Sequence, residues 1–127
     1  MHLEEKISKS LNNFEYKLEI VNNLMYLLIS SSDLQEVLLQ LKNISFQVLI
    51  DCFAINKRDD NENNIIYYHL LSYEYNQSIC VYTNVTNKSI KSIIKIFENA
   101  NWYEREIYEM YNINFIGHDK LKKLFSE

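Results

Sequence analysis

The residues best suited to chemistry gather near the end of the chain, where three glutamates and a histidine lie between positions 104 and 118. Glu106 and Glu109 are three residues apart, so a helix would place their carboxylates close together. With Glu104 and His118 they could form a carboxylate/histidine metal site. Arg105 and the nearby lysines would repel a cation, however, and the pattern therefore favours a polar surface over a metal centre.

The two cysteines, Cys52 and Cys80, are far apart, and each lies within an apolar, strand-like run. Zinc and iron–sulfur sites usually need cysteines or histidines clustered at short spacing, so we expect two buried thiols. A single glycine is too few for a dinucleotide-binding fingerprint, and the sequence shows no Ser/His/Asp constellation. The sequence therefore predicts no catalytic, cofactor-binding or metal site in this chain.

The acidic segment itself has the pattern of a capped helix. Asn101 can cap its start, which puts Glu104 and Glu106 in the first turn, facing the positive end of the helix macrodipole. Asn112 can end the helix, because asparagine tolerates the left-handed backbone conformation.

Two faces of this helix differ in character. The apolar stripe is predicted to consist of Tyr103, Ile107 and Met110. Beside it lie Trp102 and Glu106, and Arg105 can pair with Glu109 four residues later. This mixed surface is either a solvated, ion-paired helix or a polar docking surface, and the spacing alone leaves both interpretations open.

Residues 1–45 are expected to contain a helix, a hairpin and a second helix. The expected elements are a helix over Leu3–Leu11, strands over Phe14–Ile20 and Leu24–Ile29 joined at Asn22-Asn23, and a helix that starts at a capping box of Ser32 and Gln35 and ends near Lys42.

The rest of the chain is expected to begin with strands and end with helices. Strands are predicted over Val48–Ile55, Ile65–Tyr73 and Ser78–Thr86, with a charged loop at Lys57–Asn64 and a hairpin turn at Tyr75–Gln77. Before the Asn101 helix we expect another, capped by Asn87 or Ser89, with Ile90, Ile93, Ile94 and Phe97 on one face, and after it a short helix over Asp119–Phe125. The fold class is a single α+β domain, with helices flanking a mostly antiparallel sheet of four to five strands.

Composition excludes several classes of protein. The 127 residues are 47% hydrophobic, which suits one domain with a core. The net charge is -4 and the basic residues are interleaved with acids, so a general nucleic-acid binder is not expected. No apolar run approaches the roughly 20 residues of a membrane span. The start, Met1 to Lys9, resembles neither a secretory signal nor an import peptide.

The run from Ala100 to Leu124 resembles the C subunit of respiratory complex I, the thirty-kilodalton-type subunit. That family's motif is Glu-Arg-Glu, two residues, an acid, two apolar or aromatic residues, six residues, a histidine, three residues and a basic residue. Here the motif reads Glu104-Arg105-Glu106, Glu109, Met110-Tyr111, His118 and Lys122. Flanking residues and two upstream strands extend the resemblance over about residues 46–124.

Five positions depart from the family's pattern. Asn112 replaces a usual glycine, Glu109 replaces a usual aspartate, and Asp119 replaces a common proline. Lys122 and Lys123 replace a common arginine pair, and lysine keeps the charge but loses the bidentate fork. We therefore expect the Glu-Arg-Glu helix to be the stronger half of any interface and the basic end to be the weaker half.

The resemblance implies a non-catalytic structural and assembly subunit in the peripheral arm of NADH:quinone oxidoreductase, a proton-translocating enzyme that transfers electrons from NADH to ubiquinone. It implies docking against the D subunit, the forty-nine-kilodalton-type subunit, with FMN and iron–sulfur clusters in partner subunits and no cofactor in this chain. The residues to which it assigns fold and interface roles are Trp102, Glu104, Arg105, Glu106, Glu109, His118 and Lys122.

Two alternatives stay open. The chain could be the C-type subunit of a plastid NAD(P)H dehydrogenase or a membrane-bound hydrogenase, or it could be an adaptor domain unrelated to respiration. One glycine and no proline, beside many asparagine, lysine, isoleucine and tyrosine residues, are typical of an AT-rich genome. With no import peptide evident, this favours the matrix side of the mitochondrial inner membrane over the cytoplasmic face of a bacterial inner membrane.

Overall fold

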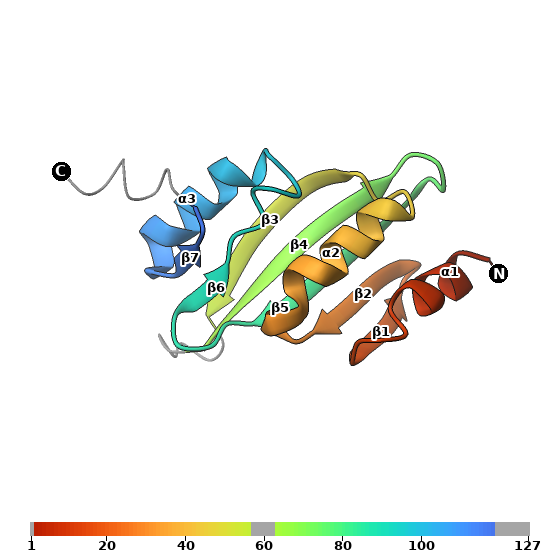
Figure 1. Ribbon diagram of the computed structural model, residues 1–127, viewed down its shortest axis with the longest axis horizontal. Helices are drawn as coiled ribbons and strands as arrows, with labels where there is room; N and C mark the ends of the chain where they lie inside the picture. The colour runs from red at the N-terminus through yellow and green to blue at the C-terminus, as the bar shows by residue number, and fades with distance from the viewer. Residues whose placement is uncertain (1, 57–62, 119–127) are drawn as a thin grey trace.

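Alternating side chains near the start of the chain form the first hairpin, β1 (Tyr16–Val21) and β2 (Leu24–Ile29). The computed structural model describes residues 2–56 and 63–118 of the protein (Figure 1). Asn22 and Asn23 turn the hairpin with φ of 51° and 68°, as the sequence predicted. Asparagine supports this left-handed conformation because its short polar side chain can hydrogen-bond locally.

Five strands form one sheet in the order β1-β2-β5-β4-β3 (Figure 1). The three further strands are β3 (Val48–Asn56), β4 (Asn64–Ser72) and β5 (Gln77–Asn84). Neighbouring strands run antiparallel except β2 and β5, which are parallel. The predicted single α+β domain with a mostly antiparallel sheet is confirmed, and so is the β4–β5 hairpin.

Helices α1 (His2–Ser10) and α2 (Leu34–Asn43) agree with the prediction, but the proposed capping box is wrong. Ser32 lies inside a short 3-10 turn, η1 (Ser31–Asp33), and Ser30 caps that turn by accepting a hydrogen bond from the Ser32 backbone N–H. The Gln35 side chain donates to the Ser92 carbonyl oxygen at 2.7 Å. The Gln35 amide therefore bonds to a residue 57 positions away, whereas the residue spacing had predicted a bond at the start of the helix.

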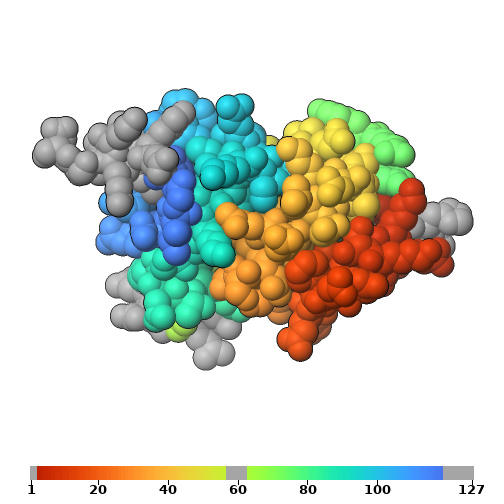
Figure 2. Space-filling view, in the orientation of Figure 1, coloured from red at the N-terminus to blue at the C-terminus, as the bar shows by residue number. Residues whose placement is uncertain are grey.

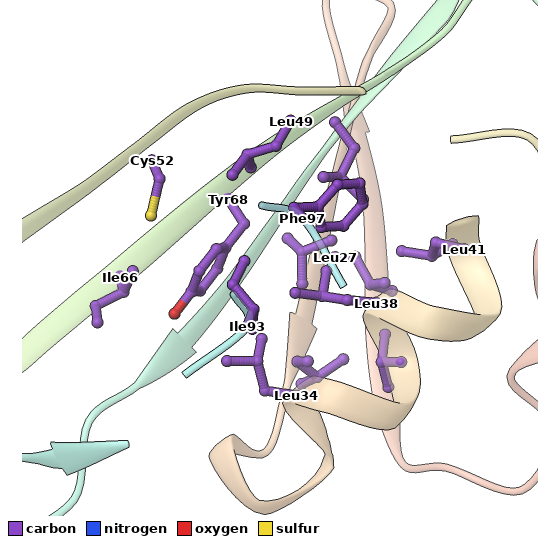
Figure 3. Packing of buried hydrophobic residues seen from close by; sticks show 14 of the residues in the cluster. Leu27, Leu34, Leu38, Leu41, Leu49, Cys52, Ile66, Tyr68, Ile93 and Phe97 are labelled. Carbon is purple, nitrogen blue, oxygen red and sulfur yellow. The ribbon is translucent and has the colours of Figure 1, made fainter. Parts of the chain in front are cut away.

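The core lies between α2 and one face of the sheet. Figure 1 shows α2 crossing this face, and Figure 3 shows its side chains against those of the strands. The buried residues of α2 are Leu34, Val37, Leu38 and Leu41. They meet Leu27 from β2 and Ile66 and Tyr68 from β4. Ile93 and Phe97, from the loop over residues 92–99, complete this part of the core.

The helix predicted after Asn87 or Ser89 is wrong. Residues Ser89–Lys91 form a short strand, β6, which pairs in parallel with β7 (Asn114–Ile116). Asn87 and Lys88 have positive φ, and residues 94–96 form a turn. Of the four residues on the predicted face, Ile90, Ile93 and Phe97 are buried and Ile94 is half-buried, so the spacing predicted burial correctly for three of them but predicted the wrong backbone structure.

Helix α3 (Ala100–Tyr111) ends as predicted, at a left-handed Asn112 with φ 59° and ψ 32°. The Asn112 backbone N–H donates to the Tyr108 carbonyl oxygen, which closes the last turn. Figure 1 places α3 beside β3, at the edge of the sheet, and the space-filling view in Figure 2 shows α2 and the C-terminal elements on one continuous surface. The short helix predicted over Asp119–Phe125 lies outside the described residues.

We predict that Asn112→Val lowers the free energy of unfolding by about 1–2 kcal/mol, because a β-branched residue is strained at this positive φ. Asn112→Gly should be neutral or slightly stabilising, since glycine adopts the same conformation without steric cost. Urea unfolding of the three proteins measures the difference. Equal stability of Asn112→Val and the wild type would contradict this account of the helix end.

Candidate functional site

The inner face of α3 carries a buried carboxylate, Glu104. The sequence predicted Glu104 in the first turn, which is wrong, because α3 begins at Ala100 and has no acidic residue in its first turn. Asn101 therefore lies inside the helix and not at its cap. The Ser92 hydroxyl donates to Glu104 Oε1 at 2.7 Å, and the Ile93 backbone N–H donates to Oε2 at 2.9 Å. The carboxyl group thus fastens α3 to the loop after β6.

His118 lies close to the same carboxyl group. Gly117, with φ 93°, turns the chain after β7 and brings it back toward α3. The His118 side chain is fully buried, with Nε2 3.9 Å from Glu104 Oε1 and 3.4 Å from the Asn101 carbonyl oxygen. The first glutamate and the histidine of the motif are therefore neighbours inside the fold, although 14 positions separate them in the sequence.

Burial changes the acidity of this carboxyl group. Desolvation raises the pKa of Glu104 from 4.5 to about 7, although the hydrogen bonds from Ile93 and Ser92 act in the opposite direction. Glu104 therefore keeps its proton across the acidic range. An unfolded glutamate, in contrast, would lose its proton near its ordinary pKa.

This difference predicts a pH-dependent stability. The pKa of Glu104 is higher in the folded than in the unfolded protein, so its contribution is fully present below about pH 4.5 and is lost as pH rises to about 7. Between these values the free energy of unfolding of the wild type should fall by about 3 kcal/mol more than that of Glu104→Gln, which cannot titrate there. Urea unfolding from pH 4.5 to 8 measures both profiles. Parallel profiles would contradict the raised pKa.

The outer face of α3 is polar and aromatic, as predicted. Trp102 is 66% exposed, and the Arg105 guanidinium carbon lies 4.9 Å from the centre of its ring. Glu106 and Glu109 are exposed. Among the described residues, the predicted ion pair between Arg105 and Glu109 does not form, because Arg105 lies over Trp102 instead.

Met110 was predicted to lie in the apolar stripe, which is wrong, since it is 67% exposed. The buried positions of α3 are Ala100, Asn101, Glu104 and Ile107, with Tyr103, Tyr108 and Tyr111 half-buried. The buried face of α3 is therefore the one that carries Glu104, whose carboxyl group is hydrogen-bonded to the loop after β6.

The four candidate metal ligands do not converge. Glu104 and His118 are buried in the fold, whereas Glu106 and Glu109 are exposed on α3. Within residues 2–56 and 63–118, no group of three or more His, Cys, Asp or Glu side chains could hold a metal ion. The predicted interface residue Lys122 lies outside the part of the chain that the structure describes.

The cysteines are separate and weakly acidic. Cys52 is buried and Cys80 is half-buried. Desolvation raises the pKa of both thiols, well above the usual range for Cys52 and to about 11 for Cys80. A thiolate is the reactive form of cysteine, so neither group is prepared for nucleophilic chemistry.

Two side chains that fix α3 to the sheet, Asn99 and Tyr103, make hydrogen bonds that the sequence did not predict. The Asn99 side chain donates to the Leu49 carbonyl oxygen at 2.9 Å, and the Tyr103 hydroxyl donates to the Ile50 carbonyl oxygen at 3.1 Å. Both contacts bind α3 to the edge of β3. They join residues about 50 positions apart, which residue spacing along one element cannot reveal.

Comparison with known proteins identifies a matching family. The family described as "Respiratory-chain NADH dehydrogenase, 30 Kd subunit" matches residues 27–127. The NADH-quinone oxidoreductase C subunit of Rickettsia typhi is 34% identical over 87 residues, covering 68% of this chain and 44% of the relative. NADH dehydrogenase [ubiquinone] iron-sulfur protein 3 of Patellifolia webbiana is 32% identical over 83 residues, covering 65% and 43%. The chain therefore spans less than half the length of these two relatives.

A third relative is named as a C/D subunit. The NADH-quinone oxidoreductase C/D subunit of Acinetobacter baylyi is 35% identical over 107 residues, covering 76% of this chain and 18% of the relative.

Solved structures share the fold. A trypsin-resistant fragment of Nqo5 has a TM-score of 0.79 at 20% identity and covers 93% of this chain and 98% of the fragment. A chain of a membrane-bound sulfane sulfur reductase, an archaeal respiratory membrane complex, has a TM-score of 0.81 at 17% identity, covering 98% and 76%.

Proposed function

The chain belongs to the family of the 30 Kd subunit of respiratory-chain NADH dehydrogenase, and we propose that it acts as a non-catalytic structural and assembly subunit in the peripheral arm of NADH:quinone oxidoreductase. In this role it docks against the D-type subunit and holds it in place while electrons pass from NADH to quinone.

The observation that carries this proposal is the division of α3 into two faces. The inner face is fixed to the fold through Glu104, whose carboxyl oxygens both accept hydrogen bonds from the loop after β6. The outer face presents a largely exposed Trp102 with Arg105 lying over its ring. Tryptophan and arginine are enriched at the energetic centres of protein interfaces. A rigid helix with such an outer face suits docking.

Within this proposal the residues of the motif have distinct roles. Trp102, Arg105, Glu106 and Glu109 contact the partner, and Glu104 and His118 hold the helix that presents them. Lys122 adds a basic contact. The domain comprises residues 1–127, with the family-like part at residues 46–124 and a supporting helix, hairpin and helix at residues 1–45.

The D-type subunit is the proposed partner because a similar chain is fused to it. The Acinetobacter relative is named as a combined C/D protein, and this chain matches 18% of its length. Fusion into one polypeptide supports a contact between the C-like and D-like parts. All three relatives carry NADH dehydrogenase or NADH-quinone oxidoreductase names, which favours this complex over a hydrogenase or an unrelated adaptor.

We further propose that this chain binds no cofactor and that FMN and iron–sulfur clusters lie in partner subunits. None of the helices that the structure describes combines the length and hydrophobicity needed to cross a bilayer. Homologues are both bacterial and mitochondrial. The AT-rich composition supports the matrix side of the mitochondrial inner membrane, with the cytoplasmic face of a bacterial inner membrane as the alternative.

Affinity purification tests the partner. A tagged copy of the chain should retain a D-type subunit, identified by mass spectrometry, through a wash at high salt. The matched control is the same tagged chain with Glu104→Ala, in which α3 loses its attachment and should retain less of that partner. Recovery of the chain without any D-type subunit would contradict the proposal.

A further inference from the structure

The face of the sheet turned away from α2 carries a ridge of stacked aromatic rings. Phe53, Tyr67 and Tyr82 are cross-strand neighbours on β3, β4 and β5. Their ring centres are 5.1 Å and 5.2 Å apart, with interplanar angles of 12° and 19°. Phe53 is 42% exposed, and both tyrosines are half-buried. No described helix lies over this ridge, and we call the surface to which it belongs the open face.

A trough runs beside the ridge. The next row across the strands consists of Asp51, His69, Cys80 and Tyr26. The short side chain of Cys80 lies between the rings of His69 and Tyr26 in this row. A cavity of about 380 Å³ opens here. Its lining includes Leu24, Tyr26, Phe53, Tyr67, His69 and Cys80.

The charged side chains of the open face lie on its two edge strands, β1 and β3. The side chains of β2, β4 and β5 that point to this face include no lysine, arginine or glutamate. On β1, Glu19 and Lys17 lie opposite Tyr26 and Leu28 and pair with each other at 3.7 Å. On β3, Asp51 Oδ1 accepts a hydrogen bond from the Cys52 backbone N–H at 2.9 Å. Nucleic acids and anionic membranes require basic residues, so an apolar protein surface is the ligand class that fits.

The open face is continuous with the outer face of α3. The two surfaces meet at β3, where the Tyr103 hydroxyl of α3 donates to the Ile50 carbonyl oxygen. Ile50 is 41% exposed and is followed in the strand by Asp51 and Phe53 of the open face. A protein seated against Trp102 can therefore extend across β3 onto the aromatic ridge.

The size of the open face favours one partner that spans both surfaces. Five strands of six to nine residues span roughly 600 Å² in projection at the usual spacing of strands and residues. A stable interface needs about 800 Å² per partner. The open face alone is too small for a stable pair of identical chains, whereas the open face and α3 together approach the required area.

We propose that the partner which binds the outer face of α3 also covers the open face, through an uncharged element whose large aliphatic side chains enter the trough. This inference rests on the proposed function, since it adds a second contact to the same partner. It predicts that an arginine on the ridge disturbs docking although the ridge lies outside the family motif.

A matched pair of variants tests the inference in the assembled enzyme. Phe53 lies on the ridge, and Leu39 lies on α2 with nearly the same exposure, 42% against 41%. Tagged full-length chains with Phe53→Arg or Leu39→Arg are expressed in cells that lack the wild-type chain. We expect Phe53→Arg to reduce recovery with the NADH-oxidising assembly at least tenfold and Leu39→Arg to leave it unchanged. Circular dichroism of each isolated chain checks that it folds.

Thiol protection tests the contact without weakening it. Phe53→Cys and Leu39→Cys are made in a Cys80→Ser background and treated with a maleimide, first as isolated chains and then within the purified assembly. Labelling at position 53 should slow at least tenfold in the assembly, whereas labelling at position 39 should not change. Unchanged labelling at position 53 would overturn the inference and leave the proposed function intact.

Two further results would contradict the inference. One would show a second copy of the chain on the open face, and the other would contradict the proposed function itself. If the isolated wild-type chain is a dimer by light scattering and Phe53→Arg makes it a monomer, then the open face binds a second copy and the inference is wrong. If the wild-type chain does not purify with an NADH-oxidising assembly at all, then the proposed function fails and the inference fails with it.

Discussion

Glu104→Ala should lower the free energy of unfolding by about 3–5 kcal/mol at pH 4.5, where Glu104 is protonated in the folded protein, because it leaves two buried donors without an acceptor. These donors are the Ser92 hydroxyl and the Ile93 backbone N–H. His118, whose Nε2 lies 3.9 Å from the same carboxyl group, would also face an empty space. The lost contacts join α3 to the loop after β6, so the whole end of the domain should loosen.

Denaturant unfolding followed by circular dichroism measures this loss. Glu109→Ala is the matched control, since it removes an exposed carboxylate from the same helix and should change stability by less than about 0.5 kcal/mol. Hydrogen exchange adds a local measurement, because the amide of Ile93 should exchange faster only in Glu104→Ala. Equal stability of the two variants would show that the carboxyl group does not hold α3.

Trp102→Ala should weaken binding to the assembly by at least ~30-fold, or about 2 kcal/mol, because exposed tryptophans at interfaces often carry much of the binding energy. Trp102 is 66% exposed, so its removal should change the stability of the isolated chain very little. Arg105 would also lose the ring over which it lies, and its guanidinium would no longer be held in one orientation.

The comparison needs two readouts on the same preparation. Retention of the D-type subunit by tagged wild type, Trp102→Ala and Leu39→Ala reports binding, and thermal unfolding of each isolated chain reports stability. Leu39 is another exposed large hydrophobic residue, on α2 instead of α3. Equal retention by Trp102→Ala and the wild type would place the interface elsewhere on the protein.

The sheet could be predicted because its strands have distinct alternation. In β4 every second residue is buried, and β2 has the predicted bounds. Asn22, Asn23 and Asn112 could be assigned to turns because they are the residues that tolerate positive φ in a chain with one glycine. These features depend on local chemistry, which a sequence records directly.

The segment from Asn87 to Phe97 could not be predicted in this way. Ile90, Ile93 and Phe97 have helical spacing, yet a short strand followed by a turn buries the same residues. What selects the strand is its parallel pairing with β7, in which Ser89 lies opposite Asn114. Hydrophobic periodicity identifies burial reliably, but it does not identify the backbone partner.

The sequence identified residues of the site, but it did not predict the contacts that those residues make. The motif singled out Glu104 and His118, but the spacing placed Glu104 at a helix start, where a carboxylate would face the macrodipole. The structure buries it against Ser92 instead. Ser92 and Ile93 belong to a loop whose position depends on the whole fold, and nothing in their own types indicates a carboxylate partner.

The most direct test of the account is native-gel migration of the chain from its own cells, with NADH-oxidation staining of the gel and immunodetection of the chain. We predict that the chain comigrates with a large NADH-oxidising assembly and that depletion of the chain reduces the amount of that assembly. Migration of the chain only at its own mass of 15.3 kDa, with the assembly unaffected by its depletion, would contradict a subunit role.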